Sequence, residues 1–353
     1  MGKYEESVGI NMTKSRILTI GLVIIIIILA VIYFTTTKKQ QSQKSPYEPV
    51  AISNQTAVAE PNNLTKVLGD SGIEKWGFGA TKDGICYLAE DFSLKFFTNT
   101  DQKTQTVFRP TDVIEAAKIV STSETCIVEY FTPEKNLLYL YSPNQAIKTL
   151  DYVPTGSISS NQNLYVIMTA TGQLILNSDG TTALTINDAE GNNMFVAPTS
   201  TQNYFLVGPY NGEDYSGKLR LVENNTVKFS QDIISAAGLA ANSTAALSAS
   251  QNENQIYGNL IDTSGQLKAK IVDIDPSTLT ATNDGFYFLT HPGGIATERA
   301  SQNGIGFISN TGEVKNVISS KDESVEQYNF SAISFVDNTL YASNGDLIYK
   351  IAI

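Results

Sequence analysis

A short turn motif recurs along the second half of the sequence and limits the possible folds more than any other feature. Each copy has a small or polar residue, a glycine and the start of an apolar run, as in TGQL at 171–174. The motif glycines, with successive spacings of 45, 48, 47 and 33 residues, are Gly172, Gly217, Gly265, Gly312 and Gly345. Glycine supplies the positive φ angle that tight hairpin turns require. The spacing predicts a repeated unit of about 45 residues built around hairpins.

From about residue 66 onward, short runs of Val, Ile, Leu, Phe and Tyr alternate with clusters of Gly, Asn, Asp, Ser and Thr. This texture is typical of short strands joined by turns. A second pattern, a polar turn followed by a β-rich run, occurs at 81–88, 160–167, 201–207, 252–258, 301–308 and 336–342. The best helix candidates, 112–120 (DVIEAAKIV) and 233–241 (IISAAGLAA), are both shorter than four turns. The predicted fold class is therefore all-β.

A period near 45 residues with several strands per unit is typical of a β-propeller blade. Such blades need a neighbour on each face, so they are stable only in a closed ring. Residues 66–353 hold a little over six units, and the unit from about residue 321 is short by one strand. Residues 63–68 (NLTKVL) could supply that strand and close the ring. We predict seven blades over 66–353, with six or eight as alternatives; two smaller β domains or an array of sandwiches is the other possible architecture.

The arrangement resembles the WD40-like and quinoprotein-like repeats of the β-propeller superfamily, in which an Asp-Gly or Asn-Gly turn precedes a strand. Such turns occur here at Asp83-Gly84 and Asn344-Gly345. The Gly-His and Trp-Asp dipeptides of WD40 repeats and the tryptophan docking motif of quinoprotein repeats are missing, since Trp76 is the only tryptophan. The resemblance implies the architecture and not the function of either family.

An uncharged apolar run of 18 residues occupies 17–34 (ILTIGLVIIIIILAVIYF). As a helix it would be about 27 Å long, close to the thickness of the hydrocarbon core of a bilayer. Lys14 and Arg16 precede it, and Lys38 and Lys39 follow it. The alternatives are a buried core helix and a cleaved signal peptide, but bulky residues stand where a cleavage site needs small ones. The run therefore predicts a single membrane-spanning anchor that contacts the lipid bilayer.

The chain is thus predicted to have four parts. Residues 1–16 form a short cytoplasmic tail, residues 17–34 the transmembrane helix, residues 35–65 a flexible stalk and residues 66–353 the propeller. The basic residues on the two sides of the anchor do not differ enough to fix its orientation. From residue 51 onward, however, 18 Lys and Arg face 32 Asp and Glu. Such an acidic domain is repelled by an anionic cytoplasmic leaflet, so we expect the large C-terminal domain on the extracytoplasmic side of the cell membrane.

The two cysteines, Cys86 and Cys126, are 40 residues apart, each in a predicted strand of adjacent units. Outside the cytoplasm they could form a disulfide, provided that their Cα atoms lie within about 7 Å of each other. The alternative is two small buried apolar side chains. The sequence leaves both possibilities open.

Composition excludes several kinds of chemistry. A net charge of −11 argues against a nucleic-acid partner, and one histidine with two cysteines cannot build a four-ligand zinc site. His291, in THPGG, lacks a recognisable Ser or Cys partner and is expected to lie in an ordinary turn. Acidic turns at 177–180, 187–192 and 211–217 carry oxygen ligands but lack EF-hand spacing. No catalytic, metal-binding or cofactor-binding residue is therefore predicted, and no cofactor.

These observations predict a membrane-anchored, extracytoplasmic β-propeller that binds or scaffolds a protein, glycan or envelope ligand without catalysis. Rigid faces built from loops suit such binding. Two alternatives are a subunit of an envelope assembly machine and an extracytoplasmic hydrolase or lyase with carboxylates in the central channel. Whether the chain is an enzyme stays open at this point.

Overall fold

The computed structural model describes residues 50–51, 64–187, 195–211, 216–233, 235–252, 255–290, 304–318 and 330–353. These residues belong to one compact unit, Pro49–Ile353. The predicted membrane segment 17–34 lies outside the described residues. Within the described ranges, every helix is too short or too polar to traverse a bilayer.

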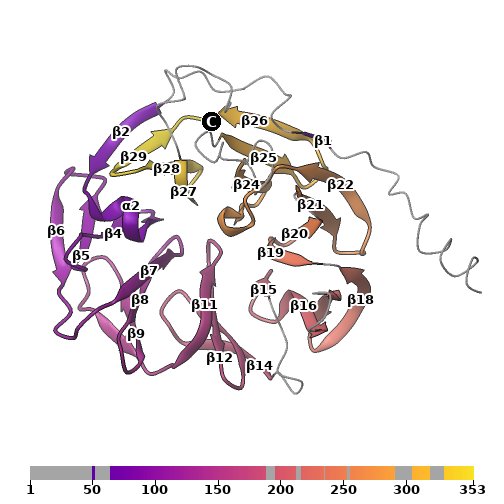
Figure 1. The fold of residues 1–353 in the computed structure, drawn as a ribbon, viewed down its shortest axis with the longest axis horizontal. Helices are drawn as coiled ribbons and strands as arrows, with labels where there is room; N and C mark the ends of the chain where they lie inside the picture. The colour runs from indigo at the N-terminus through magenta and orange to yellow at the C-terminus, as the bar shows by residue number, and fades with distance from the viewer. Residues whose placement is uncertain are drawn as a thin grey trace, which may run out of the picture. The chain divides into compact units, whose positions relative to one another are not determined.

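The described strands form seven sheets arranged in a ring (Figure 1). Blade 1 consists of β3 (Phe78–Thr81), β4 (Gly84–Leu88), β5 (Leu94–Thr98) and β6 (Thr104–Phe108). Blade 2 consists of β7 (Ala116–Ser121), β8 (Cys126–Phe131), β9 (Asn136–Tyr141) and β10 (Lys148–Leu150). Blade 3 consists of β11 (Pro154–Ser160), β12 (Leu164–Thr169), β13 (Gly172–Asn177) and β14 (Thr182–Asn187). In each blade the strands pair in chain order and antiparallel, from an inner to an outer strand.

Blades 4 to 6 repeat this plan. Blade 4 consists of β15 (Phe195–Pro198), β16 (Asn203–Asn211), β17 (Ser216–Glu223) and β18 (Thr226–Ile233). Blade 5 contains β19 (Ala236–Ala241), β20 (Ala245–Asn252), β21 (Gln255–Asp262) and β22 (Leu267–Val272). Blade 6 consists of β23 (Thr280–Ala281), β24 (Gly285–Leu289), β25 (Ile305–Ser309) and β26 (Val314–Ile318). With blade 7, described next, the prediction of a seven-bladed, all-β ring is confirmed.

Blade 7 is built from both ends of the ring. It contains β27 (Phe330–Val336), β28 (Thr339–Asn344) and β29 (Leu347–Ile351), and its outer strand is β2 (Leu64–Gly69). β2 runs antiparallel to β29, with Leu64 opposite Ile351 and Gly69 opposite Leu347. The strand proposed from residues 63–68 therefore closes the ring, as the missing strand of the last unit predicted.

One further strand lies upstream of the ring. β1 (Val50–Ala51) pairs in parallel with β22, so blade 5 has five strands. These two residues fall within the segment 35–65 that the sequence predicted as a flexible stalk. A strand here covers part of the edge of β22, whose backbone groups would otherwise be open to another chain.

The hydrophobic core is divided among the blade interfaces. Among the described residues, buried apolar side chains form seven clusters, and each cluster joins two neighbouring blades. The cause is the alternation of side chains along a strand: Ile127 on β8 packs toward blade 3, whereas its neighbour Val128 packs toward blade 1. Middle strands such as β4 and β24 are consequently buried along their whole length.

The motif glycines lie in two different kinds of hairpin. Gly172 and Gly345 lie at the hairpins between the second and third strands of their blades. Gly217 lies at the start of β17, the third strand of blade 4, directly after residues that the structure does not describe. Gly265 and Gly312, by contrast, lie between the third and fourth strands of their blades. The φ angles of Gly172, Gly265, Gly312 and Gly345 are 144°, 85°, 92° and 53°. The short spacing of 33 residues arises because the motif changes hairpin between blades 6 and 7.

The two helix candidates are a correction to the sequence analysis. Segment 112–120 supplies most of β7, and segment 233–241 supplies β19; both are inner strands. Alanine and glycine favour these positions because inner strands crowd together near the ring axis, so small side chains outweigh their low strand propensity. The described helices are instead two short elements between blades, α2 (Gly72–Trp76) and the 3₁₀ helix η3 (Pro276–Thr278).

Candidate functional site

The antiparallel order of strands gives the ring two faces with different loops. One face, which we call the upper face, carries the connections that lead from the outer strand of one blade to the inner strand of the next. It also carries the hairpins between the second and third strands of each blade. It includes α2, η3, and the connections 109–115 and 151–153. The lower face carries the remaining hairpins. Inner strands of neighbouring blades contact one another around the axis.

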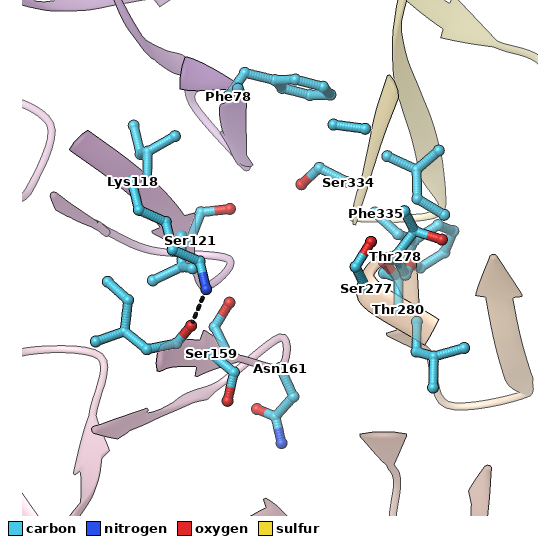
Figure 2. Close-up of a pocket in the computed structure, with 18 of the residues that line it drawn as sticks. Phe78, Lys118, Ser121, Ser159, Asn161, Ser277, Thr278, Thr280, Ser334 and Phe335 are labelled. Carbon is cyan, nitrogen blue, oxygen red and sulfur yellow. Dashed lines mark hydrogen bonds between the residues drawn. The ribbon is translucent and has the colours of Figure 1, made fainter. Parts of the chain in front are cut away.

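A cavity of about 340 Å³ occupies the central channel (Figure 2). Its walls are the inner strands of blades 1, 2, 3, 6 and 7, together with η3 and the end of α2. Hydroxyl groups line it on several sides, from Ser121, Ser159, Ser277, Thr278, Thr280 and Ser334. Among the described lining residues, Lys118 is the only charged one, and none is a carboxylate.

Lys118 extends from β7 across the boundary between blades 2 and 3. Its Nζ donates a hydrogen bond of 2.7 Å to the carbonyl oxygen of Ile158 on β11 (Figure 2). Burial lowers the pKa of the Lys118 ammonium group, and the negative charge of Glu129 acts in the opposite direction. A lysine held this way presents one cation to an otherwise neutral channel wall.

Glu129 is the cross-strand neighbour of Lys118, because the two residues are opposite each other on β8 and β7. Its side chain is fully buried. Oε1 accepts a hydrogen bond of 2.9 Å from Asn136 Nδ2, whereas Oε2 has no partner among the described residues. Burial raises the pKa of the Glu129 carboxyl group, although Asn136 and Lys118 favour the charged form. An orphaned buried oxygen is costly for a carboxylate, in agreement with the raised pKa.

The opposite wall uses its hydroxyl groups to hold η3 in place. Ser277 Oγ donates to Asp275 Oδ1 at 2.7 Å, and Thr278 Oγ1 donates to the Asp275 carbonyl oxygen at 3.0 Å. Thr278 Oγ1 also accepts from the backbone N–H of Leu289 at 2.9 Å. Thr280 Oγ1 donates to the Thr278 carbonyl oxygen at 3.1 Å. These groups are therefore engaged in structure on their own side of the channel.

The upper face of blades 1 to 3 carries an apolar rim, which we define by Trp76, Phe92, Val113 and Val153. The Trp76 and Phe92 rings pack with centroids 4.7 Å apart, and Lys75 Nζ lies 4.8 Å from the centre of the Trp76 ring. Val113 and Val153 are 74% and 67% exposed and lie on two successive connections between blades. Two exposed valines thus lie on the same face of the ring as a packed aromatic pair.

Phe92 has an unusual backbone conformation, with a φ angle of 61°. Its N–H donates to the Ala89 carbonyl oxygen at 3.0 Å, and its own carbonyl oxygen accepts from the Tyr130 hydroxyl at 2.9 Å. A positive φ is rare for a bulky residue and persists only where the surroundings impose it. The hairpin of blade 1 therefore holds Phe92 against Trp76 at a conformational cost.

The two cysteines lie on the middle strands β4 and β8 of blades 1 and 2. The structure joins Cys86 and Cys126 in a disulfide with the Cα atoms 6.7 Å apart. Both side chains are fully buried in the cluster between these blades. The bridge is a covalent link across one blade interface and lies away from the channel lining.

The other residues that the sequence singled out do not gather into a site. His291 lies outside the described residues, as do parts of the acidic turns 187–192 and 211–217. In the turn 177–180, Asp179 Oδ1 accepts from the backbone N–H of Thr181 at 2.9 Å and from its hydroxyl at 2.6 Å, so it stabilises its own turn. No three His, Cys, Asp or Glu side chains in the described ranges come close enough together to hold a metal ion.

Comparison with protein-family models finds no match, and neither does comparison with curated proteins. Solved structures do match. The WD40 propeller domain of Doa1 has a TM-score of 0.52 at 12% identity, and a chain of the Mitotic Checkpoint Complex has 0.54 at 9%; each match covers 84% of this chain and 96% of that chain. BBS1N, solved in complex with ARL6DN, has 0.51 at 14%, over 82% of this chain and 97% of that chain. The chain folds as a β-propeller.

Sequence reasoning missed the groups that distinguish this propeller. Lys118 lies within one of the segments taken as a short helix, and its pairing with Glu129 depends on the register of β7 and β8. A charged residue within an otherwise apolar strand, as Glu129 is in CIVEYF, is the one sequence signal that could have marked the pair. Val113 and Val153 carry no such signal, because exposure of a loop valine depends on the path of the whole chain.

Proposed function

We propose that the propeller is a non-catalytic module that binds or scaffolds a protein partner through the upper face of blades 1 to 3. We further propose that residues 17–34 anchor it in the cell membrane, with the propeller on the extracytoplasmic side. The observation that carries the first part is the apolar rim. The second part rests on the sequence of the anchor and on the supporting features given below.

The rim is an exception on the surface of the propeller. The described large apolar side chains that are well exposed are Val113, Val153, Val227 and Ile353. Two of these four lie on successive connections of the face that also carries Trp76 and Phe92. Exposed apolar side chains gathered on one face are a common feature of protein-binding surfaces. The conformational cost of placing Phe92 there also fits a role in binding, because strain is commonly retained at functional positions.

The fold supports a protein partner in general terms. Two of the similar structures come from assemblies, the Mitotic Checkpoint Complex and BBS1N with ARL6DN. At 9% and 14% identity these likenesses establish the fold alone, so the partner of this chain is a proposal from its own surface. A subunit of an envelope assembly machine would be one form of such a scaffold.

Three features support the extracytoplasmic placement. The uncharged run 17–34 has the length of a membrane span. The chain after residue 50 is strongly acidic, which disfavours contact with an anionic cytoplasmic leaflet. A buried disulfide such as Cys86–Cys126 is typical of proteins in oxidising compartments.

A hydrolase or lyase in the channel would need two carboxyl groups facing a common ligand. Glu129 and Asp273 are the described carboxyl groups whose pKa is raised by burial, but neither is among the residues that line the cavity. No observation on the described residues favours that alternative over binding.

The rim is tested by charge substitution. Cells carrying tagged full-length protein are cross-linked mildly, and the co-purifying proteins are identified by mass spectrometry. We expect Val113→Asp combined with Val153→Asp to lower partner recovery about tenfold or more, because charges at the centre of an apolar contact are strongly unfavourable. Val227→Asp is the matched control, since Val227 is 52% exposed on the outer strand of blade 4. Equal recovery from the double variant and the control, with unchanged melting curves, would contradict the rim as the binding surface.

A further inference from the structure

The channel wall between blades 2 and 3 contains a lysine, Lys118, whose Nζ forms no ion pair with a carboxylate of the described residues. Lys118 is buried enough for its pKa to be lowered, and its Nζ bonds to a backbone carbonyl rather than to a carboxylate. A carbonyl dipole compensates only part of a full charge removed from water. A counter-ion from the channel would complete the compensation.

Glu129 supplies only part of that compensation: its negative charge favours the charged form of Lys118, but burial lowers the Lys118 pKa overall. Although Glu129 lies opposite Lys118 on the neighbouring strand, no ion pair forms between them, and its Oε2 has no partner. Burial favours the neutral form of its carboxyl group. Burial thus works against a full charge on Glu129, and no carboxylate is present among the described residues that line the cavity beside Lys118.

Two hydroxyl groups stand beside Lys118 on the same wall. Ser121 ends β7 and Ser159 lies near the end of β11, both facing the cavity (Figure 2). On the opposite wall, Ser277, Thr278 and Thr280 are bonded around η3, as described above, and Ser334 Oγ accepts from the backbone N–H of Ala80 at 3.1 Å. By contrast, the side chains of Ser121 and Ser159 form no hydrogen bond with any other described residue. The wall therefore offers an ammonium group and two hydroxyl donors without a protein acceptor.

We propose that this wall binds a small oxyanion, a carboxylate or a phosphate group, with Lys118 Nζ as the charged donor and Ser121 and Ser159 as neutral donors. Hydrogen bonds from a cation to an anion are among the strongest in proteins. The cavity of about 340 Å³ has room for such a group on a small organic molecule. This site goes beyond the proposed function, because it uses the channel and not the apolar rim.

Calorimetric titration of purified full-length protein tests the site, with acetate and inorganic phosphate as probes and chloride as the control for ionic strength. We expect at least one oxyanion to bind with a millimolar or lower Kd. Binding of acetate but not of phosphate would identify a carboxylate site, and binding of phosphate but not of acetate would identify a phosphate site. We expect Lys118→Met to weaken binding about tenfold or more and Ser159→Ala about threefold.

Lys148→Met is the matched control. Lys148 Nζ also donates to a backbone carbonyl of blade 3, that of Asp179 at 3.4 Å, but it does so from an exposed outer strand. We expect its affinity for the probe to equal that of the unmodified protein. If neither acetate nor phosphate binds, or if folded Lys118→Met binds as well as the control, the site is refuted. Should Lys118→Met fail to fold, the combination of Ser121→Ala with Ser159→Ala decides the matter, and its unchanged affinity would equally refute the proposal.

Discussion

Asp262 shows how one side chain fixes a turn of this ring. In the hairpin that carries Gly265, Asp262 Oδ1 accepts from the hydroxyl of Ser264 at 2.6 Å and from the backbone N–H groups of Ser264 and Gln266 at 2.9 Å. Its Oδ2 lies 2.8 Å from Lys268 Nζ. Burial alone would raise the pKa of Asp262, but these bonds outweigh burial and lower it to about 2. Folding therefore favours the carboxylate.

A lowered pKa makes the contribution of Asp262 dependent on pH. The stabilisation is fully present above the ordinary aspartate pKa of 3.8 and is lost as the pH falls through about 2. We expect Asp262→Asn to lower the free energy of unfolding at pH 7 by about 2 kcal/mol. The difference from the unmodified protein should shrink below pH 4. Chemical denaturation over a pH series measures it.

Asp232→Asn is the matched control for this prediction. Asp232 lies 3.8 Å from Lys218 with its side chain 88% exposed, and such surface pairs contribute little to stability. We expect a change below about 0.5 kcal/mol at every pH. A similar loss in both variants, or a loss at Asp262 that does not vary with pH, would show that the turn bonds are not responsible.

At the scale of elements, closure of the ring depends on β2. Leu68 on β2 is buried in the cluster between blades 7 and 1, whereas Thr65 on the same strand is exposed. We expect Leu68→Ala to lower the free energy of unfolding by about 3 kcal/mol, because it leaves a cavity at the seam. Thr65→Ala is the control and should change it by less than about 0.5 kcal/mol. Equal stability of the two variants would mean that β2 does not hold the seam.

The elements also show what sequence can and cannot predict. The seventh blade followed from the repeat length and from the missing strand of the last unit, and both depend on local hairpin chemistry. The inner strands β7 and β19 were missed, because an alanine-rich segment satisfies helix propensity as well as the narrow space near the axis. α2 and η3 were missed because each is only about one turn long.

The candidate site was harder to predict than the fold. Its lysine, serines and buried glutamate come from two blades and meet only through the register of β7 with β8 and the approach of β11. No spacing along the chain marks such a meeting. The disulfide, by contrast, was foreseeable as an option, because Cys86 and Cys126 lie about one repeat apart and hence on equivalent strands.

For the whole molecule, the proposed anchor and the disulfide can be examined together in intact cells. We expect the full-length protein to stay in the membrane fraction after carbonate extraction and to be digested by protease added outside. Cys86 and Cys126 should resist alkylation until a reductant is added. Deleting residues 1–34 should abolish membrane retention. A soluble full-length protein, or freely alkylated cysteines in cells, would contradict the extracytoplasmic placement.

The shared blade 7 also sets the order in which the ring can assemble during synthesis. Apart from the short strand β1, β2 leaves the ribosome before any other described strand, yet its partner β29 is made after all of them. Six blade interfaces can therefore form one after another as the chain lengthens, while the seam between blades 7 and 1 must wait. Until β29 arrives, β2 has no strand to pair with, and the cluster between blades 7 and 1 is incomplete. The nascent chain is thus most prone to aggregation just before its synthesis passes β29.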